Sequence, residues 1–194
     1  AAKQVYSGAK DGFFANDYAR KYTAERDAAW KIAERLFEAG GKKMKVLIFR
    51  PKGRWSAPQT GVLWIHGGGY FTGFAAMAGL LGMGKRLVRR HGCVVISPAY
   101  RLRRGGRYPH ALEDCYSALL YMASHARELG IRPDQIFVGG ESAGGGLCAA
   151  LCQLARDRGQ VRIAYHMPLY PMIDDRDTDS SRDNHSLGWN TVSN

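Results

Sequence analysis

The 194-residue sequence lacks several features that would point to a metal or a phosphate ligand. Its four cysteines show no CxxC spacing of the kind found in zinc or thioredoxin-like sites, and no metal site is predicted. Each cysteine lies in an apolar stretch, where a small buried hydrophobic side chain and a reducing compartment are expected. These residues are Cys93, Cys115, Cys148 and Cys152. Neither a GK[ST] triplet nor a GxGxxG stretch opening a helix is present, which argues against a phosphate-binding loop.

A leader segment and long apolar runs are also lacking. No basic stretch followed by an apolar one opens the sequence, and the longest apolar runs are too short to cross a bilayer. Hydrophobic residues make up 45% of the chain and charged residues 23%, as in ordinary globular domains. We therefore expect a soluble, cytoplasmic protein with no membrane span.

Acidic residues are few relative to basic ones. The 28 Lys and Arg residues against 17 Asp and Glu give a formal net charge of +11. The positive charge is dispersed and forms no stripe interleaved with aromatic residues, so a solvated surface is favoured over a nucleic-acid partner. The hypothesis that the protein binds nucleic acid therefore has only the net charge to support it.

The N-terminal part reads as helical. Over residues 17–38, aromatic and aliphatic side chains recur near helical spacing, and Gly40-Gly41 would end the helix. These side chains are Tyr18, Tyr22, Ala29, Trp30, Ala33, Leu36 and Phe37.

Beyond this arm, apolar strands alternate with amphipathic helices. Strands are predicted at residues 44–49, 61–65, 93–97, 136–139 and 163–169. The helices between them carry apolar faces, of which Ala111 to Met122 and Ala143 to Leu154 are the clearest. Continuously apolar strands separated by such helices predict a mostly parallel, doubly wound sheet of the α/β class.

A GxSxG motif joins the fourth of these strands to its helix. The residues are Gly140-Glu141-Ser142-Ala143-Gly144. In a nucleophile elbow, a sharp strand-to-helix turn exposes the serine hydroxyl, and the two glycines avoid collisions with nearby backbone. Ser142 is thus the candidate nucleophile, and the amino end of the following helix would favour negative charge there.

A second glycine-rich motif, His66-Gly67-Gly68-Gly69, follows the strand at residues 61–65. Acyl transfer passes through an oxyanion that needs fixed N–H donors, and glycines can present their amides without side chains in the way. The donors are assigned to the amides of Gly68, Gly69 and Ala143. His66 and Gly67 are expected to position the loop, and His66 is not the expected base.

Together the motifs resemble the hormone-sensitive-lipase-like carboxylesterases of the α/β-hydrolase fold. Two further segments are similar to that family: Tyr100-Arg101-Leu102 with the later Ala111-Leu112-Glu113-Asp114, and residues 170–176. The family has Ala-Pro-Glu where this chain has Arg103-Arg104-Gly105, which makes the loop basic.

The resemblance implies a cofactor-independent esterase for short- or medium-acyl substrates, with an N-terminal helical cap. By this analogy residues 1–40 form the cap and residues 41–194 the hydrolase core. Aromatic side chains from the cap and the oxyanion loop would border the acyl pocket, although those of the cap equally suit packing on the core. These candidates are Phe13, Phe14, Tyr18, Tyr22, Tyr70 and Phe71.

The acid and base of a catalytic triad are not evident. In the resembling family the order is Ser, Asp, His, with the last two after strands that this sequence does not reach. None of the six histidines follows a strand carboxylate, and Asp174 and Asp175 read as structural. We therefore expect a C-terminally incomplete hydrolase, inactive or nearly so by itself, whose acid and base lie on missing sequence or on a second polypeptide. A homo-oligomer is the other expected partner.

Two other interpretations remain open. A non-catalytic small-molecule binder can share this fold, although an intact Ser142 and glycine loop favour hydrolysis. A further hypothesis is that the basic loop with Arg103, Arg104 and Arg107 favours acidic or polyphenolic esters as substrates.

Overall fold

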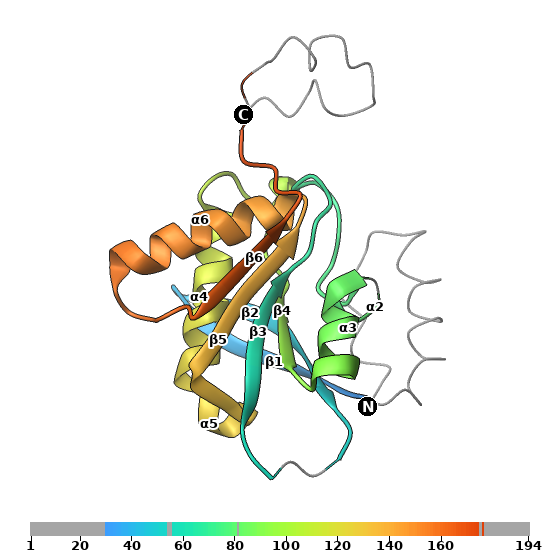
Figure 1. Ribbon diagram of the computed structural model, residues 1–194. Helices are drawn as coiled ribbons and strands as arrows, with labels where there is room; N and C mark the ends of the chain where they lie inside the picture. Colours follow the sequence, from blue (N-terminus) through green and yellow to red (C-terminus); the bar gives the residue numbers. More distant parts are fainter. Residues whose placement is uncertain (1–29, 54–55, 81, 175, 177–194) are drawn as a thin grey trace.

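A computed structural model describes residues 30–53, 56–80, 82–174 and 176. They form a six-stranded mixed sheet in the order β1-β2-β4-β3-β5-β6, with helices on both faces (Figure 1). The strands are β1 Trp30–Ala39, β2 Lys42–Pro51, β3 Gln59–Ile65, β4 Val94–Pro98, β5 Ile131–Glu141 and β6 Tyr165–Leu169. The helices are α2 Met77–Leu80, α3 Gly82–His91, the 3-10 turn η3 Arg103–Gly105, α4 His110–Ser124, α5 Ala126–Leu129 and α6 Ala143–Arg158.

The sheet is parallel in its second half. Strands β4, β3, β5 and β6 pair in parallel, whereas β1 and β2 pair antiparallel to each other and β2 pairs antiparallel to β4. Helices α2 and α3 cover one face, and α4, α5 and α6 cover the other (Figure 1). The predicted α/β class and mostly parallel sheet are confirmed.

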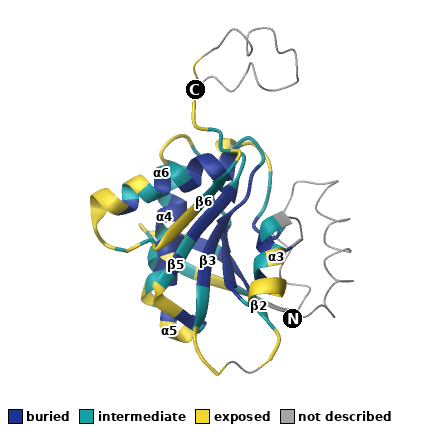
Figure 2. Ribbon diagram, viewed as in Figure 1, coloured by how far each residue is buried: buried dark blue, intermediate teal, exposed yellow. Residues whose placement is uncertain are grey.

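Both faces of the central strands are buried, which explains their unbroken apolar sequence. Along β3, Leu63 and Ile65 join the core beneath α4 and α6, whereas Val62 and Trp64 join the core beside α3. Successive side chains point to opposite faces of a strand, so a strand covered on both sides is apolar at every position. Figure 2 shows these strands as the buried centre of the molecule.

The helix predicted at residues 17–38 is wrong over residues 30–38, which belong to β1. Ten residue pairs join β1 to β2 through a two-residue turn at Gly40-Gly41, both at positive φ (56° and 73°). This turn matches the twist of a hairpin, so the glycines join two strands and do not end a helix. Ala33 and Phe37 pack on the core, and their spacing of four residues suits one face of a strand as well as a helix. Residues 17–29 lie outside the described residues.

The prediction of His166 as a core residue is also wrong. His166 lies in β6 as expected, but β6 is the last strand in the described sheet, and the histidine is exposed. Three of the cysteines are buried as predicted, whereas Cys152 is partly exposed.

The described residues contain neither a candidate membrane span nor a candidate metal site. No helix there is long and apolar enough to cross a membrane. No group of three or more His, Cys, Asp or Glu side chains there is placed to hold a metal ion.

Candidate active site

Ser142 occupies the sharp turn between β5 and α6. Its backbone angles, φ 55° and ψ −120°, lie in a region that residues other than glycine rarely adopt. Such a conformation persists only where the surroundings impose it, and it is typical of functional sites. The turn has the strand-before, helix-after context that the motif requires.

Hydrogen bonds to the end of β6, to the segment after it and to α6 hold the backbone of Ser142. Its N–H donates to the carbonyl of Leu169 at 3.0 Å, and its own carbonyl accepts from the N–H of Met172 at 3.1 Å. The same carbonyl accepts from Gly146 in the first turn of α6 at 3.0 Å. The strained turn is therefore clamped on two sides.

The motif glycines lie against backbone with no room for a side chain. A methyl group at Gly144 would overlap the carbonyl oxygens of Ile65 and His66. One at Gly140 would overlap the carbonyl of Gly144 and lie 2.8 Å from that of Ile65. The end of β3 is therefore packed directly against the turn that carries Ser142.

The glycine loop after β3 is packed onto the serine. A methyl group at Gly67 would lie 2.8 Å from the Glu141 carbonyl oxygen and 3.2 Å from Ser142 Cβ. Because β3 and β5 are parallel neighbours, their carboxyl ends meet at one edge of the sheet. The fold thus brings together the two motifs, which lie some seventy positions apart in the sequence.

The three predicted oxyanion donors have no acceptor within the described part of the chain. The amides of Gly68, Gly69 and Ala143 form no hydrogen bond there, although the carbonyl of Gly68 accepts from Phe71 and Thr72. Unpaired N–H groups beside a candidate nucleophile suit a ligand oxygen that carries negative charge.

His66 makes its contacts with the loop backbone. Its side chain is 1% exposed, and its Nδ1 lies 2.8 Å from the Gly67 carbonyl oxygen. Burial lowers the pKa of His66 to about 4, although the hydrogen bond to Gly67 opposes the shift. A neutral imidazole that donates to Gly67 suits the expected positioning role.

Tyr100, to which the sequence analysis assigned no role, holds His66 from the other side. Its hydroxyl donates to the His66 carbonyl at 2.8 Å, and the two rings stack with centroids 4.4 Å apart. Tyr100 follows β4 just as His66 follows β3, and these strands are parallel neighbours. That shared position after adjacent strands is the sequence signal that could have found it.

Of the predicted pocket residues, Tyr70 and Phe71 lie directly after the glycine loop. Tyr70 is half-buried, and its hydroxyl donates to the Met172 carbonyl at 3.3 Å, which links the loop to the segment that holds Ser142. Phe71 is 38% exposed. The cap candidates Phe13, Phe14, Tyr18 and Tyr22 lie outside the described residues.

The structure brings no described acid or base to the serine. Among the described residues, no hydrogen bond joins the Ser142 hydroxyl to a histidine or a carboxylate. His91 and His110 lie at helix ends, as predicted, and the Asp174 carboxylate pairs with Arg176. Asp175 and His185 lie outside the described residues.

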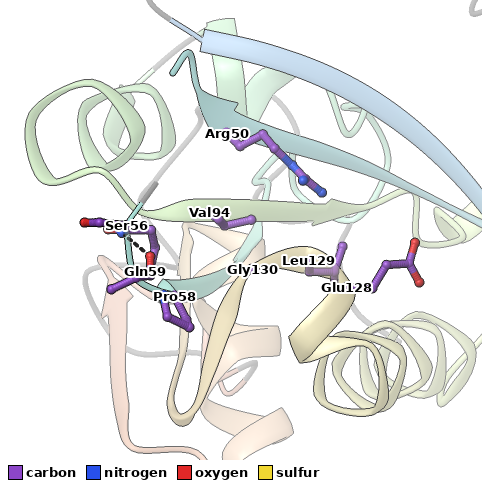
Figure 3. A pocket seen from close by; sticks show the side chains of 9 residues that line it. Arg50, Ser56, Pro58, Gln59, Val94, Glu128, Leu129 and Gly130 are labelled. Carbon is purple, nitrogen blue, oxygen red and sulfur yellow. Dashed lines mark hydrogen bonds between the residues drawn. The ribbon is translucent and has the colours of Figure 1, made fainter. Parts of the chain in front are cut away.

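A separate hollow of about 300 Å³ lies at the opposite end of the sheet (Figure 3). It is found where β3, β4 and β5 begin, and its walls include Arg50, Gln59, Val94 and Glu128. None of the predicted site residues lines it.

The fold, the serine turn and the glycine loop define a member of the α/β hydrolases. A family model described as alpha/beta hydrolase fold (Abhydrolase_3) matches residues 62–192. The chain belongs to this family of hormone-sensitive-lipase-like hydrolases, which confirms the resemblance seen in its motifs.

Relatives with esterase names support this membership. The chain is 33% identical to arylacetamide deacetylase of Oryctolagus cuniculus over 145 residues, 72% of this chain and 36% of that protein. It is 35% identical to carboxylesterase NlhH of Mycobacterium tuberculosis over 114 residues, 57% of this chain and 34% of that protein. The solved structure of a bacterial heroin esterase matches with a TM-score of 0.75 and 34% identity, covering 88% of this chain and 54% of that chain. The chain therefore spans about a third of these curated relatives and about half of that structure.

Proposed function

We propose that this chain supplies the nucleophile and oxyanion side of a serine carboxylesterase. The observation that carries the proposal is the packing of the glycine loop against a strained Ser142, with no room for a side chain at Gly67. Esterase names among the relatives support ester substrates. Short- or medium-acyl esters are the proposed substrates, and no cofactor is invoked.

The proposed reaction has two halves. The Ser142 oxygen attacks the ester carbonyl carbon and loses its proton to a base, and the amides of Gly68, Gly69 and Ala143 stabilise the oxyanion. The C–O bond then breaks, the alcohol leaves with that proton, and an acyl-enzyme remains. Water, deprotonated by the same base, hydrolyses the acyl-enzyme to release the acid and regenerate the serine.

The base and its orienting acid are proposed to come from sequence beyond these 194 residues or from a second polypeptide. Loss of triad partners leaves only the residual catalysis that an oxyanion hole and binding provide. An intact mass under denaturing conditions distinguishes the possibilities. A single species near 21.4 kDa predicts near-background activity, whereas a larger or second polypeptide can supply the missing groups.

A fluorophosphonate probe tests the assignment of Ser142 in the whole protein that carries this chain. We expect labelling of the unaltered protein and of Ser117→Ala, whose hydroxyl bonds only to its own helix through Glu113. We expect none of Ser142→Ala. Folded protein that stays unlabelled yet binds small esters would instead support the non-catalytic binder.

A further inference from the structure

A cation lies over an aromatic ring beside the glycine loop. The guanidinium carbon of Arg103 lies 4.9 Å from the centroid of the Phe71 ring, a distance typical of a cation–π contact. Both side chains are exposed. No described residue hydrogen-bonds the guanidinium of Arg103, so its N–H groups are available for an anion.

The pair is fastened to the loop by backbone hydrogen bonds. The N–H of Phe71 donates to the Gly68 carbonyl at 3.1 Å, and the N–H of Arg103 donates to the Tyr70 carbonyl at 2.9 Å. The segments that carry Phe71 and Arg103 are about thirty residues apart in the sequence, and they meet directly after the candidate oxyanion donors of the glycine loop. Hydrogen bonds hold the backbone of both residues, and the ring contacts the guanidinium.

Arg103 differs from its neighbour Arg101 in having no acidic partner. Arg101 is engaged by Asp114, which accepts from its Nε at 2.8 Å and its Nη2 at 2.6 Å. No described carboxylate pairs with Arg103, and its contact with Phe71 leaves its charge uncompensated. An uncompensated guanidinium with a fixed plane is the group that binds carboxylates best, because its paired N–H donors match the two oxygens.

We propose that Arg103 binds a carboxylate on the substrate, so that the enzyme prefers small esters that carry this group over neutral ones. The proposal rests on the proposed ester hydrolysis at Ser142. Arg103 is a specificity residue in this scheme, because it contacts the substrate away from the scissile bond and takes no part in the proton transfers.

The competing explanation is that Arg103 only shields the Phe71 ring from water. Arg103→Lys and Arg103→Gln both weaken that shielding, but only the lysine keeps a positive charge. Arg107→Gln is the matched control, since Arg107 is exposed in the same loop and its loss changes the net charge equally.

The experiment compares 4-acetoxybenzoate with its methyl ester, in which the carboxylate is masked, and follows release of acetate from the acetyl ester that both compounds share. For the whole protein, kcat/KM is measured for both esters and expressed as the ratio of the anionic to the neutral substrate. We expect Arg103→Gln to lower this ratio about tenfold, the effect of one charge-assisted hydrogen bond, with Arg103→Lys retaining most of it. Arg107→Gln should leave the ratio as it is.

An equal ratio in the unaltered protein and Arg103→Gln overturns the proposal while esterase activity stands. Failure to hydrolyse either ester overturns the esterase function instead. In that case binding of 4-(2-oxopropyl)benzoate, in which a CH2 group replaces the ester oxygen and leaves no bond to hydrolyse, still tests Arg103 by calorimetry. Binding that Arg103→Gln weakens and Arg107→Gln does not supports the anion site, and equal binding by all three proteins rejects it.

Discussion

The Tyr100 hydroxyl donates to the backbone carbonyl of His66, and the Tyr100 ring stacks on the His66 ring. Both side chains are almost fully buried, at 4% and 1% exposure. His66 in turn contacts the Gly67 carbonyl, and Gly67 lies so close to Ser142 that a methyl group on it would be 3.2 Å from Ser142 Cβ. A chain of contacts therefore runs from the end of β4 to the candidate nucleophile.

We predict that Tyr100→Phe slows reaction at Ser142 without unfolding the protein. The variant keeps the ring stack but leaves the buried His66 carbonyl without this donor, which costs about 1 kcal/mol of stability. A looser loop misplaces the oxyanion donors, so fluorophosphonate labelling should slow about tenfold or more.

Tyr116→Phe is its control, because the Tyr116 hydroxyl donates to Gln160 at 2.7 Å, away from the serine. Urea unfolding should show a loss of similar size in both variants. Equal labelling rates in both would show that Tyr100 has no special relation to the site.

Gly144→Ala is expected to disable the site through steric overlap. The new methyl group would meet the carbonyl oxygens of Ile65 and His66, and relief requires β3 and the serine turn to separate. Overpacking of this kind costs about 1–3 kcal/mol, and labelling should be lost with it. In Gly105→Ala the nearest atom is 3.7 Å away, so that variant should resemble the unaltered protein. Full labelling of folded Gly144→Ala would contradict the close packing described above.

Burial of His66 predicts a loss of stability in acid. Because its folded-state pKa of about 4 lies below the 6.5 of an unfolded chain, the unfolded state takes up the proton first as the pH falls. The stability that depends on the neutral ring is complete above about pH 6.5 and declines toward pH 4, by on the order of 3 kcal/mol.

His66→Gln removes this titration while other groups continue to titrate. The difference in unfolding free energy between the two proteins should therefore shrink as the pH falls from 7 to 4, as measured by urea denaturation at each pH. Parallel pH profiles would mean that His66 is not the buried neutral group.

Asp114→Ala should destabilise the fold severely. Asp114 is 3% exposed and receives the backbone N–H as well as the side chain of Arg101. Removing one partner of such a pair leaves the other uncompensated and costs about 3 kcal/mol. Asp134→Ala breaks the exposed pair with Arg132 and should hardly change the unfolding midpoint. Similar losses in both would contradict the difference in burial.

Motifs and strand periodicity predicted the sheet and the placement of the two glycine-rich segments. Ser142 and Gly67 meet because parallel strands end at one edge, a rule that sequence alone can apply. The same reasoning placed the apolar strands correctly, because burial on both faces leaves a continuous apolar run.

Prediction from the sequence failed where pairing between distant segments decides the local structure. Ala33 and Phe37 fit a helix or a strand equally, and only the pairing of β1 with β2 selects the strand. The exposure of His166 depends on which strand is last in the sheet, and the local sequence pattern carries no information about strand order. Tyr100 and Arg103 gain their roles from contacts with residues more than thirty positions away.

The clamp on Ser142 has a consequence for the order of assembly. Two of its three backbone partners, Leu169 and Met172, come about thirty residues later in the chain and become available only once β6 is in place. During synthesis, a ribosome that has extruded β5 and α6 has produced the serine and its hydrogen bond to Gly146, but not the two bonds from the other side. The turn that carries Ser142 is therefore completed late, after the polypeptide around it has been made.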